Sequence, residues 1–209
     1  MKLIIELQYF PPVILYRNLY KFSHIEFEQY EFYNKMSFRN RCIIAGANGK
    51  ISLSIPLENG REQKRLAKDV RISNIHSWQK NHWKTIESCY NKSPWFEYYK
   101  YDLHALYIKP FSYLLDWNLA CFNWSIDKLK IPVHHSLSSG FMKQPVEGLA
   151  DWRNKILPRN YEGFKPLKYS QVFEEKTGFL PNISILDLLF CEGKNAKNLL
   201  ESLQGGEEE

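Results

Sequence analysis

The segment RNRC contains two arginines, Arg39 and Arg41, separated by a single residue. In an extended strand such residues share a face and lie roughly 7 Å apart. A guanidinium offers a fork of N–H donors that fits a carboxylate or a phosphate. We therefore expect Arg39, Asn40 and Arg41 to bind an anionic group. The alternative is a surface arginine pair neutralised by glutamates of the segment 26–31.

His82 is the one histidine that falls on the inward face of an expected helix, together with Trp78 and Ile86. Imidazole titrates near neutral pH, so His82 is the candidate general base. The alternative is a neutral core histidine that bonds a backbone carbonyl. The remaining histidines give no His-Glu-x-x-His pattern, and neighbours such as His134 and His135 rarely converge on one ion. We expect no metal and no cofactor.

Acidic and basic side chains alternate in DWRNKI, residues 151–156, where Asp151 and Arg153 could clamp a polar ligand or pair with each other. Near the C-terminus, Ser184 and Asp187 could be a nucleophile and a carboxylate. They also fit a Ser-x-x-Asp capping box, in which the acid reaches back to the first backbone amide of a helix. No Gly-x-Ser-x-Gly elbow surrounds Ser184, so we favour the capping box.

Alternation and helical periodicity place these residues on elements. Apolar patterns predict strands at 3–8, at 24–32, on both sides of Asn48-Gly49 and at 69–73, and helices from Pro12, from Ser77 to Tyr90, from Pro94, from Pro110 and from Ser184. The expected fold is α/β, with a mixed sheet from residues 3–73 and helices packed on it; the alternative is α+β. Residues 131–183 are rich in proline and show little periodicity, as binding loops or lids do.

Asn48-Gly49 between two apolar runs is a strong hairpin signal, because a tight turn needs positive φ at both central residues. A loop of these two residues would set Ile44 opposite Leu53 and Cys42 opposite Ile55. Arg39 and Arg41 would then share the face opposite the apolar one. A register error of one residue would reverse these assignments.

Composition limits the class of protein. The chain has 209 residues and a net charge of +5, a mild excess that does not indicate a nucleic-acid binder. We expect one domain over residues 1–203 and a disordered acidic tail at 204–209. The four cysteines show no zinc or disulfide spacing, and no window is apolar enough for a membrane span. The start of the chain does not read as a signal peptide, so we expect a cytoplasmic location. The oligomeric state is not predicted.

Several segments in order resemble the WbqC-like protein family: QYFPP at 8–12, EFYNKMSFRNRC at 31–42, NGKISLSIPL at 48–57, a Trp-x-x-x-His-Trp motif at 78–83, YNKSPWFEYY at 90–99, DWRNKI at 151–156, YSQVF at 169–173 and GFLPNISILDLLFCEG at 178–193. The tyrosine usual before RNRC is Phe38 here. The residues that match the family pattern are Gln8, Tyr9, Asn40, Arg41, His82, Tyr169, Gln171 and Asp187.

The resemblance implies a bacterial protein linked to O-antigen and related surface polysaccharides. Members of the family are described as transferases, with glycine transfer suggested. We therefore expect an acyl or aminoacyl transferase that acts on an amino sugar, with an anionic or nucleotide-sugar-like substrate. His82 would be the base, and Gln8, Tyr9, Arg41, Tyr169 and Gln171 would bind or orient the substrate. The alternative is a non-catalytic scaffold or ligand-binding protein of the same pathway, which would bury His82.

Overall fold

The computed structural model describes residues 1–58, 64–143 and 147–202. Its main sheet has four parallel strands in the order β5-β2-β1-β6, namely β1 (Lys2–Ile5), β2 (His24–Phe27), β5 (His134–Leu137) and β6 (Leu149–Asp151). A separate antiparallel hairpin consists of β3 (Arg41–Gly46) and β4 (Gly49–Ser54). The tail expected at 204–209 lies outside the described residues.

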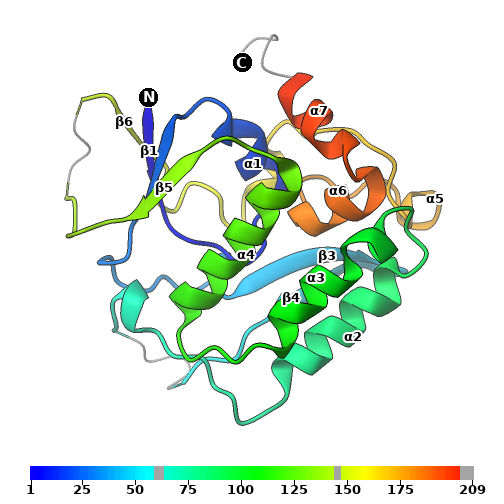
Figure 1. Cartoon of the computed structure of the whole chain (residues 1–209), viewed down its shortest axis with the longest axis horizontal. Coiled ribbons are helices and arrows are strands. Elements are labelled where there is room, and N and C mark those ends of the chain that lie inside the picture. Colours follow the sequence, from blue (N-terminus) through cyan, green and yellow to red (C-terminus); the bar gives the residue numbers. More distant parts are fainter. Residues whose placement is uncertain (59–63, 144–146, 203–209) are drawn as a thin grey trace.

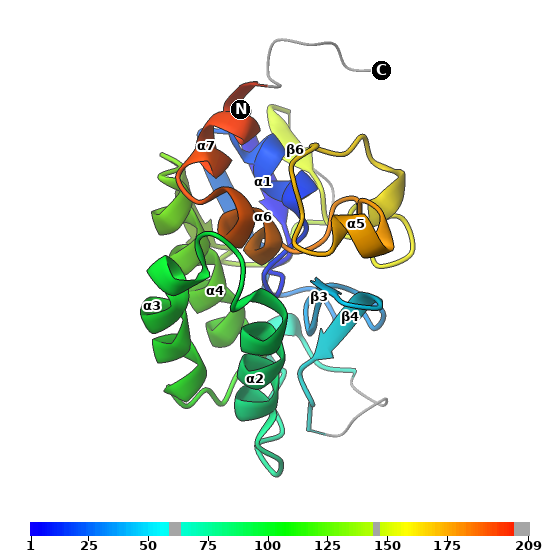
Figure 2. The same ribbon diagram turned by 90° about the vertical axis from the view of Figure 1, so that its right-hand side faces the viewer.

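Seven α-helices surround the two sheets in the described part of the chain: α1 (Val13–Leu19), α2 (Trp78–Tyr90), α3 (Phe96–Ile108), α4 (Leu114–Leu129), α5 (Glu174–Thr177), α6 (Ile185–Glu192) and α7 (Asn195–Ser202). Short 3-10 turns occur at η2 (Ala67–Asp69) and η3 (Tyr161–Gly163). In Figure 1, α4 runs beside the parallel sheet, whose strands β1, β5 and β6 are labelled at the upper left. Figure 2 shows α2, α3 and α4 on one side of the molecule and the hairpin on the other, with α6 between α1 and the α2–α4 group.

The fold is α/β, as expected, because α1 connects two parallel neighbours, β1 and β2. Pro12, with an extended backbone at the N-cap of α1, is the residue after which the helix begins. The origin of the strands differs from the expectation that residues 3–73 supply the sheet. β5 and β6 come from the 131–183 region, where we expected irregular structure. They have only four and three residues, HHSL and LAD, too few for a recognisable alternation, so their pairing with β2 and β1, and not their own pattern, makes them strands.

The hairpin forms where expected, but its turn is displaced. The closing pair is Gly46 and Gly49, so Ala47 and Asn48 make the turn, and of these residues Gly49 alone has a positive φ, +110°. Cys42 lies opposite Leu53, not Ile55, and the predicted register is wrong by two residues. A shift of two keeps every side chain on its face.

Other boundaries follow the pattern closely. α2 covers the expected helix, with Ser77 at its N-cap but without a side-chain cap bond. α3 and α4 begin at Phe96 and Leu114, a few residues after the prolines that predicted them. The strand expected at 69–73 is reduced to isolated bridges, such as that between Leu57 and Ile72.

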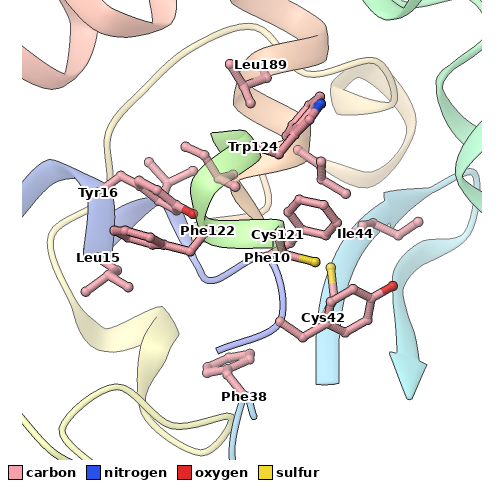
Figure 3. Close-up of a cluster of buried hydrophobic side chains, with 14 of the residues drawn as sticks. Phe10, Leu15, Tyr16, Phe38, Cys42, Ile44, Cys121, Phe122, Trp124 and Leu189 are labelled. Atoms are coloured by element: carbon pink, nitrogen blue, oxygen red, sulfur yellow. The ribbon is translucent and has the colours of Figure 1, made fainter. Parts of the chain in front are cut away.

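The core is dense in aromatic rings contributed by every layer. Figure 3 shows Phe10, from the segment before α1, between Trp124 of α4 and Ile44 of the hairpin. Phe122 of α4 packs edge-on against Phe27 of β2, with ring centroids 4.8 Å apart, and stacks with Tyr16 of α1. The face of the sheet that carries Phe27 is thus the buried one, and α1 and α4 cover it. The four cysteines are free, and Cys42 and Cys121 lie together in this core.

Gly193 ends α6 under a tight constraint. Its φ is +55°, and a Cβ built there would lie 2.1 Å from the Trp95 ring. We expect Gly193→Ala to lower the free energy of unfolding by more than the roughly 1–2 kcal/mol of the left-handed conformation alone, because Trp95 must also move. Denaturant unfolding measures the loss. Gly163→Ala is the control, since its Cβ meets nothing within 4 Å and its φ is not positive. Equal losses in the two variants would contradict this packing.

Candidate active site

Polar residues follow each strand of the parallel sheet at its carboxyl end. Glu6 follows β1, Glu28 follows β2, Ser138 follows β5, and Asp151 ends β6. Parallel strands end at one edge of the sheet, so these side chains gather there. β2 and β5 lie on one side of β1, whereas β6, the next strand along the chain, lies on the other side. The order of the strands therefore changes direction between β1 and β6. Ligands of open α/β sheets bind in the crevice at such a switch point.

Glu6 is buried at this switch point, with 1% of its surface exposed. Its Oε1 accepts from Gln8 Nε2 at 2.7 Å, and its Oε2 accepts from the backbone N–H of Asn154 at 2.8 Å. Burial raises the pKa of Glu6, while the charge of Arg39 and these hydrogen bonds oppose the rise. The carboxylate thus ties the segment after β1 to the segment after β6.

Glu28 and Asp151 share Arg153. Glu28 accepts from Ser138 Oγ at 2.9 Å and from the backbone N–H of Tyr30 at 2.8 Å, and its Oε2 lies 3.3 Å from Arg153 Nη1. Arg153 Nη2 donates to Asp151 Oδ2 at 2.6 Å and its Nε to Oδ1 at 3.0 Å. These hydrogen bonds lower the pKa of Asp151, so it is ionised at neutral pH.

Asn154 is the centre of a second part of the network. Arg39 pairs with Glu31 and also donates from Nη1 to Asn154 Oδ1 at 3.1 Å. Asn154 Nδ2 donates to Glu31 at 3.3 Å, and its Oδ1 accepts from Asn34 at 2.9 Å. Its φ is +58°, an uncommon conformation for a residue other than glycine. Strain of this kind concentrates at functional sites.

The network opens to a cavity of about 440 Å³, large enough for a small molecule. Its lining combines aromatic rings with charged and amide groups from the carboxyl ends of β2, β5 and β6 and the segments after them: Tyr30, Glu31, Phe32, Phe141, Asp151, Arg153 and Asn154. Phe32 and Phe141 are 69% and 52% exposed. Arg153 lies over the Phe141 ring, 5.5 Å from its centroid. We call this space the edge cavity.

Four of the residues predicted to bind substrate therefore meet at one edge of the sheet: Gln8, Arg39, Asp151 and Arg153. Arg41 does not join them; it lines a different cavity of about 400 Å³ with residues 34–36 and 157–159. Asn40 holds the hairpin, because its Nδ2 donates to the Ile55 carbonyl at 3.1 Å. The sequence left two interpretations of the arginine pair: binding of an anion, or neutralisation by a glutamate. The second describes Arg39, which pairs with Glu31.

Tyr9 and His82 form a separate, buried cluster. The Tyr9 hydroxyl lies 3.0 Å from His82 Nδ1 and 2.7 Å from the Tyr107 hydroxyl. Burial lowers the pKa of His82 to about 4, against the effect of a hydrogen bond with the Ser54 backbone, so the ring is neutral at pH 7. His82 lines neither the edge cavity nor the Arg41 cavity. This geometry is that of the core histidine, the alternative to a general base.

Tyr169 and Gln171 meet Asp187 in a third cluster. The Tyr90 hydroxyl donates to Asp187 Oδ1 at 2.7 Å, and Tyr169 Oη and Gln171 Nε2 donate to Oδ2 at 2.8 and 3.0 Å. Only the Ser184 half of the predicted capping box forms. Ser184 does cap α6, accepting from the Leu186 N–H, but its own N–H donates to the Ile43 carbonyl and not to Asp187. Asp187 is wholly buried, which raises its pKa to about 6.

Sequence reasoning missed Glu6, Ser138 and Asn154, and it named Glu28 and Glu31 only within the glutamate segment that could neutralise the arginine pair. Glu6 and Glu28 fall inside the expected strands at 3–8 and 24–32, so their place directly after the shorter strands of the structure was not predicted. Asn154 lies within the conspicuous DWRNKI segment. Ser138 required β5, which the sequence pattern does not show. Among the described residues, no group of three or more His, Cys, Asp or Glu side chains could hold a metal ion.

The fold and the site define an α/β protein with a polar and aromatic cavity at the carboxyl edge of a small parallel sheet. Comparison with protein families then places it: the model of the WbqC-like protein family matches residues 8–157, and the chain belongs to this family. The segments at 169–173 and 178–193 lie beyond the matched range. No curated protein and no solved structure matches the chain. None of the helices in the described residues combines the length and apolar composition needed to cross a membrane.

The raised pKa of Asp187 predicts a pH dependence of stability. The folded pKa of about 6 exceeds the ordinary 3.8, so the native state holds the proton more tightly than the unfolded state. The stabilisation is complete below about pH 4 and is lost as the pH rises through about 6. Relative to Asp187→Asn, the wild-type free energy of unfolding should fall by about 2 kcal/mol between pH 4 and pH 7. Urea unfolding across this range measures it.

Tyr169→Phe provides the control for this prediction. The Tyr169 hydrogen bond lowers the pKa of Asp187, so its removal should move the loss of stability to higher pH. A difference between wild type and Asp187→Asn that is constant from pH 4 to pH 7 would show that the carboxyl is not the titrating group.

Proposed function

We propose that the chain binds an amino sugar in the edge cavity and transfers an acyl or aminoacyl group, such as glycyl, to its amine during the synthesis of a bacterial surface polysaccharide. One observation carries the proposal: carboxylates and aromatic rings line one cavity at the switch point of a parallel sheet. Family membership supports the reaction class that the resemblance implies.

The lining suits an aminated sugar. Phe32 and Phe141 offer exposed rings on which the apolar face of a pyranose can pack. Asp151 remains ionised beside Arg153 and can accept hydrogen bonds from hydroxyl or ammonium groups. The acidic side chains of the lining favour a ligand with an amino group over a neutral sugar.

The reaction needs an activated acyl donor, such as an ester or thioester. The amine nitrogen attacks the acyl carbon, a new amide bond forms, and the bond to the leaving group breaks. The amine loses one proton, which ultimately leaves with the released alcohol or thiol. Glu31 lines the cavity, and its Oε2 receives one long contact of 3.3 Å from Asn154, so this oxygen is the acceptor we propose for the proton.

A second candidate function is a non-catalytic ligand-binding protein of the same pathway. The burial of His82 and the fully bonded state of Asp187 favour it, because both groups behave as structural residues. The two functions share the ligand and differ in turnover.

Ligand-observed NMR with glucosamine, N-acetylglucosamine and glucose tests the binding. We expect glucosamine to bind most tightly, because its amine meets the carboxylates. Phe32→Ala and Phe141→Ala should each weaken binding about tenfold, or ~1.4 kcal/mol. Both side chains are exposed, so the fold should tolerate the changes. Tyr101→Ala, an exposed ring on α3, is the matched control and should leave binding unchanged.

Incubation with an activated aminoacyl or acyl donor separates the two functions. Amide product detected by mass spectrometry supports the transferase, and its loss in Glu31→Gln with binding retained would support the proton acceptor. Saturable binding without product would favour the ligand-binding protein. Equal affinity for all three sugars, or binding unaffected by the phenylalanine variants, would refute the edge cavity as the sugar site.

A further inference from the structure

A second cavity, of about 400 Å³, is lined by three cations and no acid. Lys35 lies in the segment between β2 and β3, Arg41 is the first residue of β3, and Arg159 lies in the segment after β6. The remaining lining residues are uncharged: Asn34, Met36, Leu157 and Pro158. We call this space the cationic cavity. Three like charges around one space repel each other, so an anion bound among them would relieve the repulsion.

The cations of this cavity lack partners in the described part of the chain. No side-chain hydrogen bond or salt bridge joins Lys35, Arg41 or Arg159 to any other described residue. The Nε of Arg41 is buried from solvent without an acceptor. A buried donor without a partner is unfavourable, because it has lost its hydrogen bonds to water and gained none in return.

Arg39 shows what a structural arginine looks like in the same segment. It stands two residues before Arg41 and is 2% exposed, and it uses its Nη atoms on Glu31 and Asn154. Arg41 has the same chemistry and no such partners. The fold thus pairs the Nη atoms of Arg39 internally, although its Nε is also buried without an acceptor. Arg41 lines a cavity and has no side-chain partner among the described residues.

The cationic cavity adjoins the edge cavity through one hydrogen bond. Asn34 lines the cationic cavity, Asn154 lines the edge cavity, and Asn34 Nδ2 donates to Asn154 Oδ1 at 2.9 Å. Both sides of this boundary contain backbone in the left-handed region, at Asn154 (φ +58°) and at Met36 (φ +55°). Non-glycine residues in this conformation store strain and occur preferentially where ligands bind.

We infer that the cationic cavity binds phosphate, and that the ligand of this protein spans both cavities as a sugar carrying a phosphate or nucleoside diphosphate. Guanidinium forks match phosphate oxygens in pairs, and three cations balance the charge of a diphosphate better than that of a single carboxylate. The volume also exceeds what a carboxylate fills. The sugar half of this inference rests on the proposed function; the phosphate half rests on Lys35, Arg41 and Arg159 alone.

Isothermal titration of the full chain with pyrophosphate and with uridine diphosphate tests the phosphate half. We expect saturable binding that Arg41→Ala and Arg159→Ala each weaken at least tenfold. Arg41→Lys should restore only part of it, because lysine keeps the charge and loses the fork. Arg71→Ala, at an exposed arginine paired with Glu58, is the matched control and should bind as wild type does. Circular dichroism checks folding, and exposed Arg159 supplies a variant with little structural risk.

Competition distinguishes the anion classes. If acetate or glycine displaces pyrophosphate at equal concentration, the cavity is a carboxylate site and the inference is overturned. It is also overturned if neither phosphate ligand binds at millimolar concentration, or if the double variant of Arg41 and Arg159 binds as wild type does.

The phosphate half and the sugar half of the inference can be refuted independently of each other. A uridine diphosphate amino sugar should bind more tightly than uridine diphosphate, and Phe141→Ala should remove that difference. If the sugar adds no affinity while Arg41→Ala still abolishes pyrophosphate binding, the phosphate site holds and the proposed sugar site fails. If glucosamine binds in the edge cavity but Arg41→Ala and Arg159→Ala leave pyrophosphate binding unchanged, the reverse is true.

Discussion

Burial of charge at the carboxyl edge of the parallel sheet constrains the rest of the structure. Glu6, Glu28 and Glu31 are at most 8% exposed, and a buried carboxylate is costly unless a cation and hydrogen bonds compensate it. Arg39 and Arg153 provide that compensation. Arg39 comes from the start of the hairpin and Arg153 from the segment after β6, so both elements must dock before the carboxylates are neutralised. The network therefore couples the hairpin to the sheet, although the two share no strand pairing.

The cost of burying charge also distinguishes the charged side chains that pair with one another from those that remain available to a ligand. Most acids and bases at this edge are consumed by one another, and Asn118 of α4 fixes the approach by donating to the Arg39 carbonyl at 2.7 Å. The acids of the edge cavity, Glu31 and Asp151, are already paired with Arg39 and Arg153. Among the described residues, the cations of the neighbouring cavity are the charged group that this pairing leaves over.

Two buried polar clusters away from the edge hold other segments in place. Tyr90 of α2 accepts the Ala45 N–H of the hairpin and donates to Asp187 of α6, so one hydroxyl joins three elements. Tyr9 joins the segment after β1 to α2 and α3 through His82 and Tyr107. The polar groups of both clusters form hydrogen bonds with one another, as buried polar groups in folded proteins generally do. Residues that match a family pattern can therefore serve packing as readily as chemistry.

The sequence by itself determined the elements whose patterns are local. Periodicity was sufficient for α1 and α2, alternation for β2 and β3, and the Asn-Gly pair for a hairpin. The order of the motifs was sufficient to identify the family. Arg39, Asp151 and Arg153 were recognised as candidate ligand-binding residues. Tertiary structure decided what depends on distant partners. β5 and β6 become strands only because β2 and β1 offer free edges, and this pairing brings Glu6, Glu28 and Ser138 to Arg153. Tertiary structure likewise made Arg39 structural and left Arg41 open, and it turned the acid of an apparent capping box into a buried hydrogen-bond acceptor. Local patterns encode which face of an element is apolar, whereas the pairing of charges depends on long-range contacts that no short segment contains.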